Sequence, residues 1–196
     1  MPSALISNAS RILVPVEVEA IRSVIRKPSN VLLFDLLLYT GLRLSEVLQL
    51  AQSPDLFDND RRIITIRSGK ARASQITRNV KLCDKGVAAV KRYLERPKVP
   101  ASPSSWQLNL IRWGGAAQLS SVPGHDPGGW NPYRLTVRTS RKTLESWLLA
   151  AYPDRATHIA LSQGHTEVTA LKFYLNIAFT REERDAIVRE VAGLDW

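Results

Sequence analysis

Residues 31–50 read VLLFDLLLYTGLRLSEVLQL, and this stretch decides the fold. The almost wholly apolar run at 31–39 predicts a helix that is buried, because it is too short to span a membrane and Asp35 interrupts it. Gly41 ends that helix, and the apolar residues that follow keep a helical period. Arg43 therefore lies at the first turn of the next helix, where a cation can leave the core.

The chain on both sides of this stretch is mainly helical. Between Arg62 and Leu82, two β-rich runs flank the polar sequence Ser68-Gly69-Lys70 and predict a hairpin with Lys70 at or near its tip. We therefore expect a mainly α fold with a small antiparallel β-hairpin, in one domain over residues 1–196. Apolar residues at helical spacing predict the other helices, near 18–25, 85–96, from Ser105 to the glycines at 114 and 115, 139–151, 156–162, 167–174 and 180–191.

Composition bounds the partners and the compartment. The 27 Lys and Arg against 18 Asp and Glu give a formal net charge of +9, which favours a polyanionic partner, either nucleic acid or an acidic membrane. The N-terminus lacks the features of a secretory signal, and the single Cys83 cannot form an internal disulfide, so we expect an intracellular location, in the cytoplasm or nucleoid. One Cys and three scattered His argue against a structural zinc site.

The run Thr40-Gly-Leu-Arg-Leu-Ser-Glu46 resembles the first catalytic box of the tyrosine recombinase, or phage integrase, family, whose pattern is T-G-L-R-x-S-E. The resemblance implies that Arg43 is one of two arginines that clamp the DNA phosphate to be cleaved. Phosphate transesterification needs fixed positive charge around the phosphate oxygens, and a guanidinium supplies it with two parallel hydrogen bonds.

The predicted hairpin is similar to the family's pattern G-K-G-x-x-R-x-V-P-L, with Lys70 near the turn and Arg78 at the arginine position. Lys81 stands where proline is usual. The resemblance implies that Lys70 is the general acid that protonates the departing 5′-oxygen. A positioned proton donor of this kind accelerates a reaction by about two to four orders of magnitude.

The second box of the family reads H-x-L-R-H-T, and the corresponding residues here are Arg138-Thr-Ser-Arg-Lys-Thr143. Arg141 matches the second clamping arginine. Arg138 replaces the first histidine, Ser140 the leucine and Lys142 the second histidine. Some branches of the family, including archaeal virus integrases, also carry lysine or arginine at the position of the first histidine. Helical spacing puts Arg138 and Arg141 on one face. An arginine can stabilise a charged transition state, but it is a poor proton acceptor, so the acceptor of the tyrosine proton stays open.

The run Gln163-Gly-His-Thr-Glu-Val-Thr-Ala-Leu-Lys-Phe-Tyr174 resembles the family's L-G-H-S-x-x-x-T-x-x-Y segment, with Gln163 in place of leucine. The resemblance implies that His165 donates a hydrogen bond to the phosphate. It also implies that Tyr174 is the nucleophile, which attacks phosphorus in line and leaves a 3′-phosphotyrosine and a free 5′-hydroxyl. This linkage conserves the phosphodiester energy, so no metal, ATP or other cofactor is expected.

Each of these residues also has an ordinary explanation when it is taken alone: a solvated arginine, a turn lysine or a half-buried tyrosine. Their order and separations, however, follow the family over about residues 14–179. The resemblance implies a site-specific recombinase (integrase) from a mobile genetic element, acting on double-stranded DNA as a tetramer. It also implies a mainly α catalytic domain with a hairpin or three-stranded sheet.

The ends of the chain carry two further expectations. Family members usually have a separate N-terminal DNA-binding domain, for which this sequence leaves no room. A C-terminal segment of family members often docks on a neighbouring protomer, so the helix at 180–194, with Thr180 and Glu183 as a capping box, is expected either to exchange between protomers or to pack on its own domain.

Two other functions are compatible with the same residues. The altered second box is compatible with a decayed integrase that regulates through DNA binding without cleavage. The shared tyrosine chemistry is compatible with a topoisomerase-like enzyme or a telomere resolvase.

Overall fold

The computed structural model describes residues 4–67, 77–99, 102–122, 129–164 and 177–194. These residues are mainly helical and carry small antiparallel sheets, so the expected fold class is confirmed. Within these ranges no helix combines the length and the apolar character that crossing a membrane requires.

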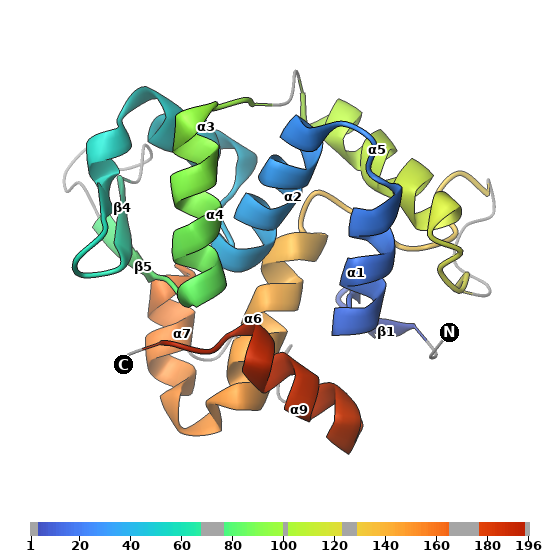
Figure 1. The fold of residues 1–196 in the computed structure, drawn as a ribbon. Helices are drawn as coiled ribbons and strands as arrows, with labels where there is room; N and C mark the ends of the chain where they lie inside the picture. The colour runs from blue at the N-terminus through green and yellow to red at the C-terminus, as the bar shows by residue number, and fades with distance from the viewer. Residues whose placement is uncertain (1–3, 68–76, 100–101, 123–128, 165–176, 195–196) are drawn as a thin grey trace.

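Helix α2 (Pro28–Thr40) occupies the centre of the molecule, between α4 (Asp84–Glu95) and α1 (Pro15–Val24) in Figure 1. It also packs on α6 (Thr139–Ala151), and its side chains are buried from Leu33 to Thr40. A helix that is apolar all round has no solvent face, which is why this stretch organises the core. The helix begins earlier than its apolar run predicts because Pro28 fits the first helical turn.

The turn after α2 sets the direction of the next helix. Gly41 has a φ of +64° and its N–H donates to the Leu37 carbonyl, so the chain leaves α2 in a left-handed conformation that favours glycine. Helix α3 (Leu44–Gln52) then starts with Arg43 as its N-cap residue. The sequence-based placement of Arg43 at a helix start is therefore confirmed.

The predicted hairpin is present as β4 (Ile63–Arg67) and β5 (Thr77–Lys81), with β3 (Phe57–Asp58) as a third antiparallel strand beside β4. Ile64 pairs with Val80 and Ile66 with Arg78. Paired residues point to the same side of a sheet, and Ile64, Val80 and Ile66 are buried. The register thus directs the Arg78 side chain inward. Residues 68–76, which include Lys70, lie outside the described residues.

A second sheet at the N-terminus was not predicted from the sequence. Strands β1 (Leu5–Ser7) and β2 (Ser10–Ile12) form a short hairpin that packs on α6. Buried Arg11 on β2 pairs with Glu17 of α1 and donates to the Ser120 carbonyl at 2.7 Å. Strands of three residues are too short for alternation to reveal them, and a buried arginine breaks the apolar pattern.

The remaining helices follow the predicted order. They are α5 (Pro103–Ala116), α7 (Ala156–Ser162) and α9 (Arg181–Glu190), with single 3₁₀ turns at Pro54–Leu56 and Pro153–Arg155. Gly114 lies in the last turn of α5 against Leu135, whose Cδ1 would be 2.5 Å from a Cβ at this position. The helix predicted at 167–174 lies outside the described residues.

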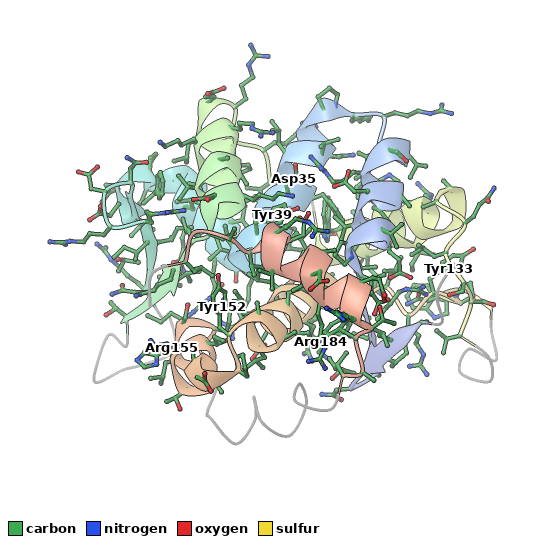
Figure 2. All side chains as sticks on the ribbon, turned by 60° about the horizontal axis from the view of Figure 1, so that its bottom comes forward. Asp35, Tyr39, Tyr133, Tyr152, Arg155 and Arg184 are labelled. Carbon is green, nitrogen blue, oxygen red and sulfur yellow. The ribbon has the colours of Figure 1, made fainter. Side chains whose placement is uncertain are left out.

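Helix α9 packs on α6 and α1 of its own chain. Ile187 and Val191 are fully buried, and the predicted capping box is confirmed, because Thr180 and Glu183 exchange hydrogen bonds of 2.8 and 3.2 Å. At the other end, Tyr39 donates to Glu190 at 2.6 Å and Tyr152 donates to the Val191 carbonyl at 3.2 Å; Figure 2 labels both tyrosines beside this end of α9. Burial raises the pKa of Tyr39, and the hydrogen bond to Glu190 acts in the same direction.

Candidate active site

Arg43 and Glu46 form the first part of the site at the start of α3. The Glu46 carboxylate accepts the Arg43 backbone N–H at 2.7 Å and an Arg43 guanidinium N–H at 2.8 Å. A carboxylate at this position also caps the positive end of the helix. The Glu46 side chain is 6% exposed and that of Arg43 is 52% exposed, so the carboxylate holds Arg43 while the guanidinium remains open to solvent.

Arg141 reaches the same carboxylate from α6. Its Nη1 donates to the Gly41 carbonyl at 2.8 Å and lies 4.0 Å from Glu46 Oε2. The side chain is buried, and its Nη2 has no hydrogen-bond partner among the described residues. A buried donor without a partner is costly, and such groups are rare in folded proteins. The structure therefore brings Arg43 and Arg141, nearly one hundred residues apart in the sequence, to one carboxylate with a donor unused.

Arg78 of β5 is a third cation at this point. Its Nη2 lies 2.7 Å from Glu46 Oε2, and its Nη1 donates to the Ser162 carbonyl at the end of α7. We call Arg43, Arg78 and Arg141 together with Glu46 the guanidinium cluster. Glu46 belongs to the first box and Arg78 matches the hairpin pattern, but the sequence alone predicts a role for neither. Two features of the sequence could have indicated these contacts: Arg78 is on the same side of its strand as the apolar Val80, and the acidic Glu46 follows Arg43 by three residues.

Charge in the guanidinium cluster is unbalanced. Burial raises the pKa of Glu46, but Arg78 and Arg43 outweigh it and hold that pKa below its ordinary value, so the carboxylate is ionised. Burial, followed by Arg78 and then Arg43, lowers the pKa of Arg141 to about 10, against the opposing effect of Glu46 and Glu145. Arg141 is still protonated at neutral pH. Positive charge thus exceeds negative charge in a partly desolvated site, an arrangement suited to an anion.

Arg138 is placed differently from Arg141. It is the N-cap residue of α6, its side chain is exposed, and its backbone N–H donates to Thr136 Oγ1 at 3.2 Å. Its backbone is helical, as the predicted shared face requires, but its side chain is exposed whereas that of Arg141 is buried, and joint action of the two arginines on one phosphate stays a prediction. The structure does not bring Arg138 to Glu46.

Lys142 serves the fold. Its ammonium donates to the carbonyls of Ser7 and Asn8, both at 2.9 Å, in the turn between β1 and β2. Burial lowers the pKa of Lys142, and nearby Arg138 lowers it further. Lys142, which stands where the family has its second histidine, therefore links the N-terminal hairpin to α6 and takes no part in the guanidinium cluster.

The other three predicted site residues, Lys70, His165 and Tyr174, lie outside the described residues. The described residues nevertheless include the neighbours in sequence of the segments that carry them. Strands β4 and β5 border residues 68–76, and Gly164 precedes His165 with a φ of +67°. The roles of these three residues stay predictions.

The Gln163 side chain packs against the turn at Gly41. It is 1% exposed, and a Cβ at Gly41 would lie 2.4 Å from its Oε1, so Gly41 leaves the space that the amide occupies. Neither amide atom of Gln163 has a hydrogen-bond partner among the described residues. The family pattern has leucine here, and the polar replacement leaves an unsatisfied amide beside the carbonyl that orients Arg141.

We expect Gln163→Leu to stabilise the protein by about 1–3 kcal/mol, because it removes a buried polar group without a partner at similar volume. Urea unfolding followed by circular dichroism measures the change. Gln49→Leu is the matched control, since the Gln49 amide makes only a long contact of 3.4 Å to the Arg67 carbonyl on the surface, and we expect a change within about 0.5 kcal/mol there. A lower unfolding midpoint for Gln163→Leu would contradict this account of the site.

A family model described as "Phage integrase family" matches residues 12–181. No match was found among curated proteins. Among solved structures, XerA recombinase superposes with a TM-score of 0.58 at 21% identity, covering 97% of this chain and 65% of that one.

Two further solved structures share the fold at low identity. The Tn1549 transposon integrase in complex with circular intermediate DNA gives a TM-score of 0.61 at 17% identity and covers 92% of this chain and 66% of its own. An integrase from mycobacterium phage Brujita gives 0.55 at 16% identity, with coverages of 97% and 60%. The chain therefore spans less than two thirds of the length of the XerA recombinase. The match of the family model over most of the sequence shows that the chain belongs to the phage integrase family, as the four motifs indicated.

Proposed function

We propose that the chain is the catalytic domain of a site-specific tyrosine recombinase, which cleaves and rejoins DNA through a 3′-phosphotyrosine intermediate. The observation that carries this proposal is the convergence of Arg43 and Arg141 on Glu46, where Arg141 Nη2 finds no acceptor among the residues that the structure describes. A DNA phosphate supplies both the negative charge and the acceptor that this site lacks. Membership of the phage integrase family supports the same chemistry.

The proposed reaction balances without an added cofactor. The Tyr174 hydroxyl gives its proton to solvent as its oxygen attacks phosphorus, the bond from phosphorus to the 5′-oxygen breaks, and Lys70 gives a proton to that oxygen. Arg43 and Arg141 stabilise the extra negative charge on the phosphate oxygens in the transition state. Attack of a 5′-hydroxyl on the phosphotyrosine reverses these steps and joins a new strand, so neither a metal nor ATP is needed.

Arg138 and His165 complete the proposed site. His165 acts as a further hydrogen-bond donor to the phosphate, as the resemblance implies. Arg138 is exposed at the N-terminus of α6, where its charge can act on the phosphate from the solvent side. It is a poor base, so we assign it charge stabilisation and leave the tyrosine proton to another acceptor.

Two alternatives keep the same fold. A decayed integrase that only binds DNA is favoured by Arg138 in place of histidine. A topoisomerase-like enzyme or a telomere resolvase would use the same residues for a different outcome. The guanidinium cluster retains both clamping arginines, which favours an active enzyme over the regulator.

Double-stranded DNA is the proposed substrate, with the cytoplasm or nucleoid as the proposed location. The Tn1549 integrase structures are themselves complexes with DNA. We further propose a tetramer on DNA in which the helix at 180–194 is exchanged. In the isolated chain α9 buries Ile187 and Val191 against its own domain, and an exchanged helix would fill the same place on a neighbour.

The recombinase proposal predicts a covalent complex with DNA that depends on Tyr174. Denaturing electrophoresis after incubation with nicked duplexes of random sequence should show the adduct for the wild type and none for Tyr174→Phe. Arg141→Lys should lower the cleavage rate by about 10²–10³, because a lysine loses the forked donor set. Arg61→Lys, an exposed arginine on the turn before β4, should cleave like the wild type. An adduct that persists in Tyr174→Phe contradicts the proposal.

Exchange of α9 can be tested through the ion pair of 2.7 Å between Lys85 and Glu190. A zero-length carbodiimide cross-linker joins such a pair covalently, and we expect the product to have monomer mass without DNA and multiples of it on DNA. Lys85→Arg keeps the charge but cannot form the amide, and is the control. Products of monomer mass alone, from samples that sediment as oligomers on DNA, count against exchange and for packing within one chain.

A further inference from the structure

Arg78 is the one member of the guanidinium cluster without a role in the proposed chemistry. Its side chain is 12% exposed although it comes from a surface hairpin, because the register with Ile66 turns it to the buried face of the sheet. One Nη binds the Glu46 carboxylate and the other binds the Ser162 carbonyl. The guanidinium therefore connects β5 to the start of α3 and to the end of α7.

The turn after α7 rests directly on this side chain. A Cβ at Gly164 would lie 3.0 Å from Arg78 Cδ and 3.3 Å from Nε, and Gly164 has a φ of +67°. Both the close approach and the left-handed backbone favour glycine here. Ser162 adds a second tie, because its hydroxyl accepts the backbone N–H of Lys81 on β5 at 3.3 Å. The backbone that leads into His165 thus takes its position from Arg78 and its strand.

We infer that Arg78 is a positioning residue for the proposed cleavage reaction: it holds the Glu46 carboxylate between Arg43 and Arg141 and fixes the hairpin and the end of α7 to that carboxylate. The inference rests on the proposed function. In this role one side chain fixes the relative positions of the start of α3, α6, the β4–β5 hairpin and the end of α7 at a single phosphate site.

A direct contact of Arg78 with the phosphate is disfavoured by its own hydrogen bonds. Both of its Nη atoms bind protein acceptors, and its Nε, which is buried without a hydrogen-bond partner among the described residues, lies against the turn at Gly164. Arg43, by contrast, is half exposed, and the described residues offer no acceptor to Arg141 Nη2. Glu46 Oε1 accepts from the Arg43 guanidinium, and Oε2 accepts from both Arg78 and the Arg43 backbone N–H. Removing Arg78 would leave Oε2 with only the backbone donor, so that it could draw Arg141, now 4.0 Å away, from an incoming phosphate.

A purely stabilising role is also disfavoured. A buried ion pair contributes little to stability once desolvation is counted. Arg78 moreover repels its neighbours, since its charge is the largest effect after burial in lowering the pKa of Arg141. Such an unfavourable cluster of like charges is typical of functional sites, where an anion restores the balance.

The test compares Arg78→Met and Arg78→Lys with Arg61→Met, a matched loss of an arginine that is 80% exposed. Single-turnover cleavage of the nicked duplexes and the DNA dissociation constant are measured separately. We expect Arg78→Met to slow cleavage about a hundredfold, as a displacement of about 1 Å in an active site does, with DNA affinity close to that of the control. Arg78→Lys should recover only part of the rate, because one ammonium cannot reach both acceptors.

Two further measurements separate positioning from a general effect on folding. In the double variant with Glu46→Gln, the losses should not add, since both changes break the same contact. In ¹⁵N NMR spectra, the side-chain Nε–H signals of Arg43 and Arg141 should shift in Arg78→Met and in Glu46→Gln but not in Arg61→Met. If Arg78→Met does not fold, Arg78→Lys carries both comparisons.

The outcomes distinguish this inference from the proposed function. If the wild type cleaves DNA and Arg78→Met cleaves it as fast as Arg61→Met, the positioning role is overturned and the recombinase proposal is unaffected. No adduct from the wild type, together with shifted Arg43 and Arg141 signals, supports the contact and removes the recombinase. If the losses in cleavage rate from Arg78→Met and Glu46→Gln add in the double variant, or if the Nε–H signals of Arg43 and Arg141 do not shift, the role of Arg78 in the cluster is overturned.

Discussion

One buried carboxylate holds the site together. Glu46 binds Arg43 from its own helix and Arg78 from the sheet, and it lies 4.0 Å from Arg141 of α6. Without this carboxylate the three guanidinium groups would repel one another, most strongly Arg78 and Arg141, which are largely buried. Its place follows from the fold. The left-handed turn at Gly41 ends the central helix, starts α3 beside it, and presents both the Glu46 side chain and the Gly41 carbonyl to Arg141.

The same carboxylate leaves the cluster short of negative charge. Glu46 restrains the cations but does not neutralise them, and the described part of the chain supplies no acceptor for the buried Nη2 of Arg141. Organisation of this kind is what catalysis of phosphate transfer requires, because the charges stand in position before the reaction and need not reorganise when the transition state forms. Under the proposed function, the DNA phosphate is the group that completes the site, and the free protein bears the cost of the arrangement.

Local patterns in the sequence predicted the parts of this structure that depend on near neighbours. The buried helix before Gly41, the β4–β5 hairpin and the Thr180 capping box follow from periodicity and turn residues, and all three are present. The β1–β2 hairpin and the contacts of Arg78 with Glu46 and Ser162 join segments far apart in the chain, which single-sequence patterns do not encode. The family motifs named Arg43 and Arg141 as partners, but only the fold shows that Glu46 joins them. The exposure of Arg138 and the burial of Arg141 could not be predicted from helical spacing, because spacing fixes the direction of a side chain and not what packs over it.

The central claim is that the guanidinium cluster grips a backbone phosphate of duplex DNA. An experimental structure of the protein bound to DNA tests it most directly. The account predicts one phosphate whose oxygens lie within about 3 Å of guanidinium nitrogens of both Arg43 and Arg141, with Glu46 still bound to Arg78 beneath them and the Tyr174 hydroxyl able to reach the phosphorus. DNA seated on another face of the molecule, with no phosphate between the two arginines, would contradict it.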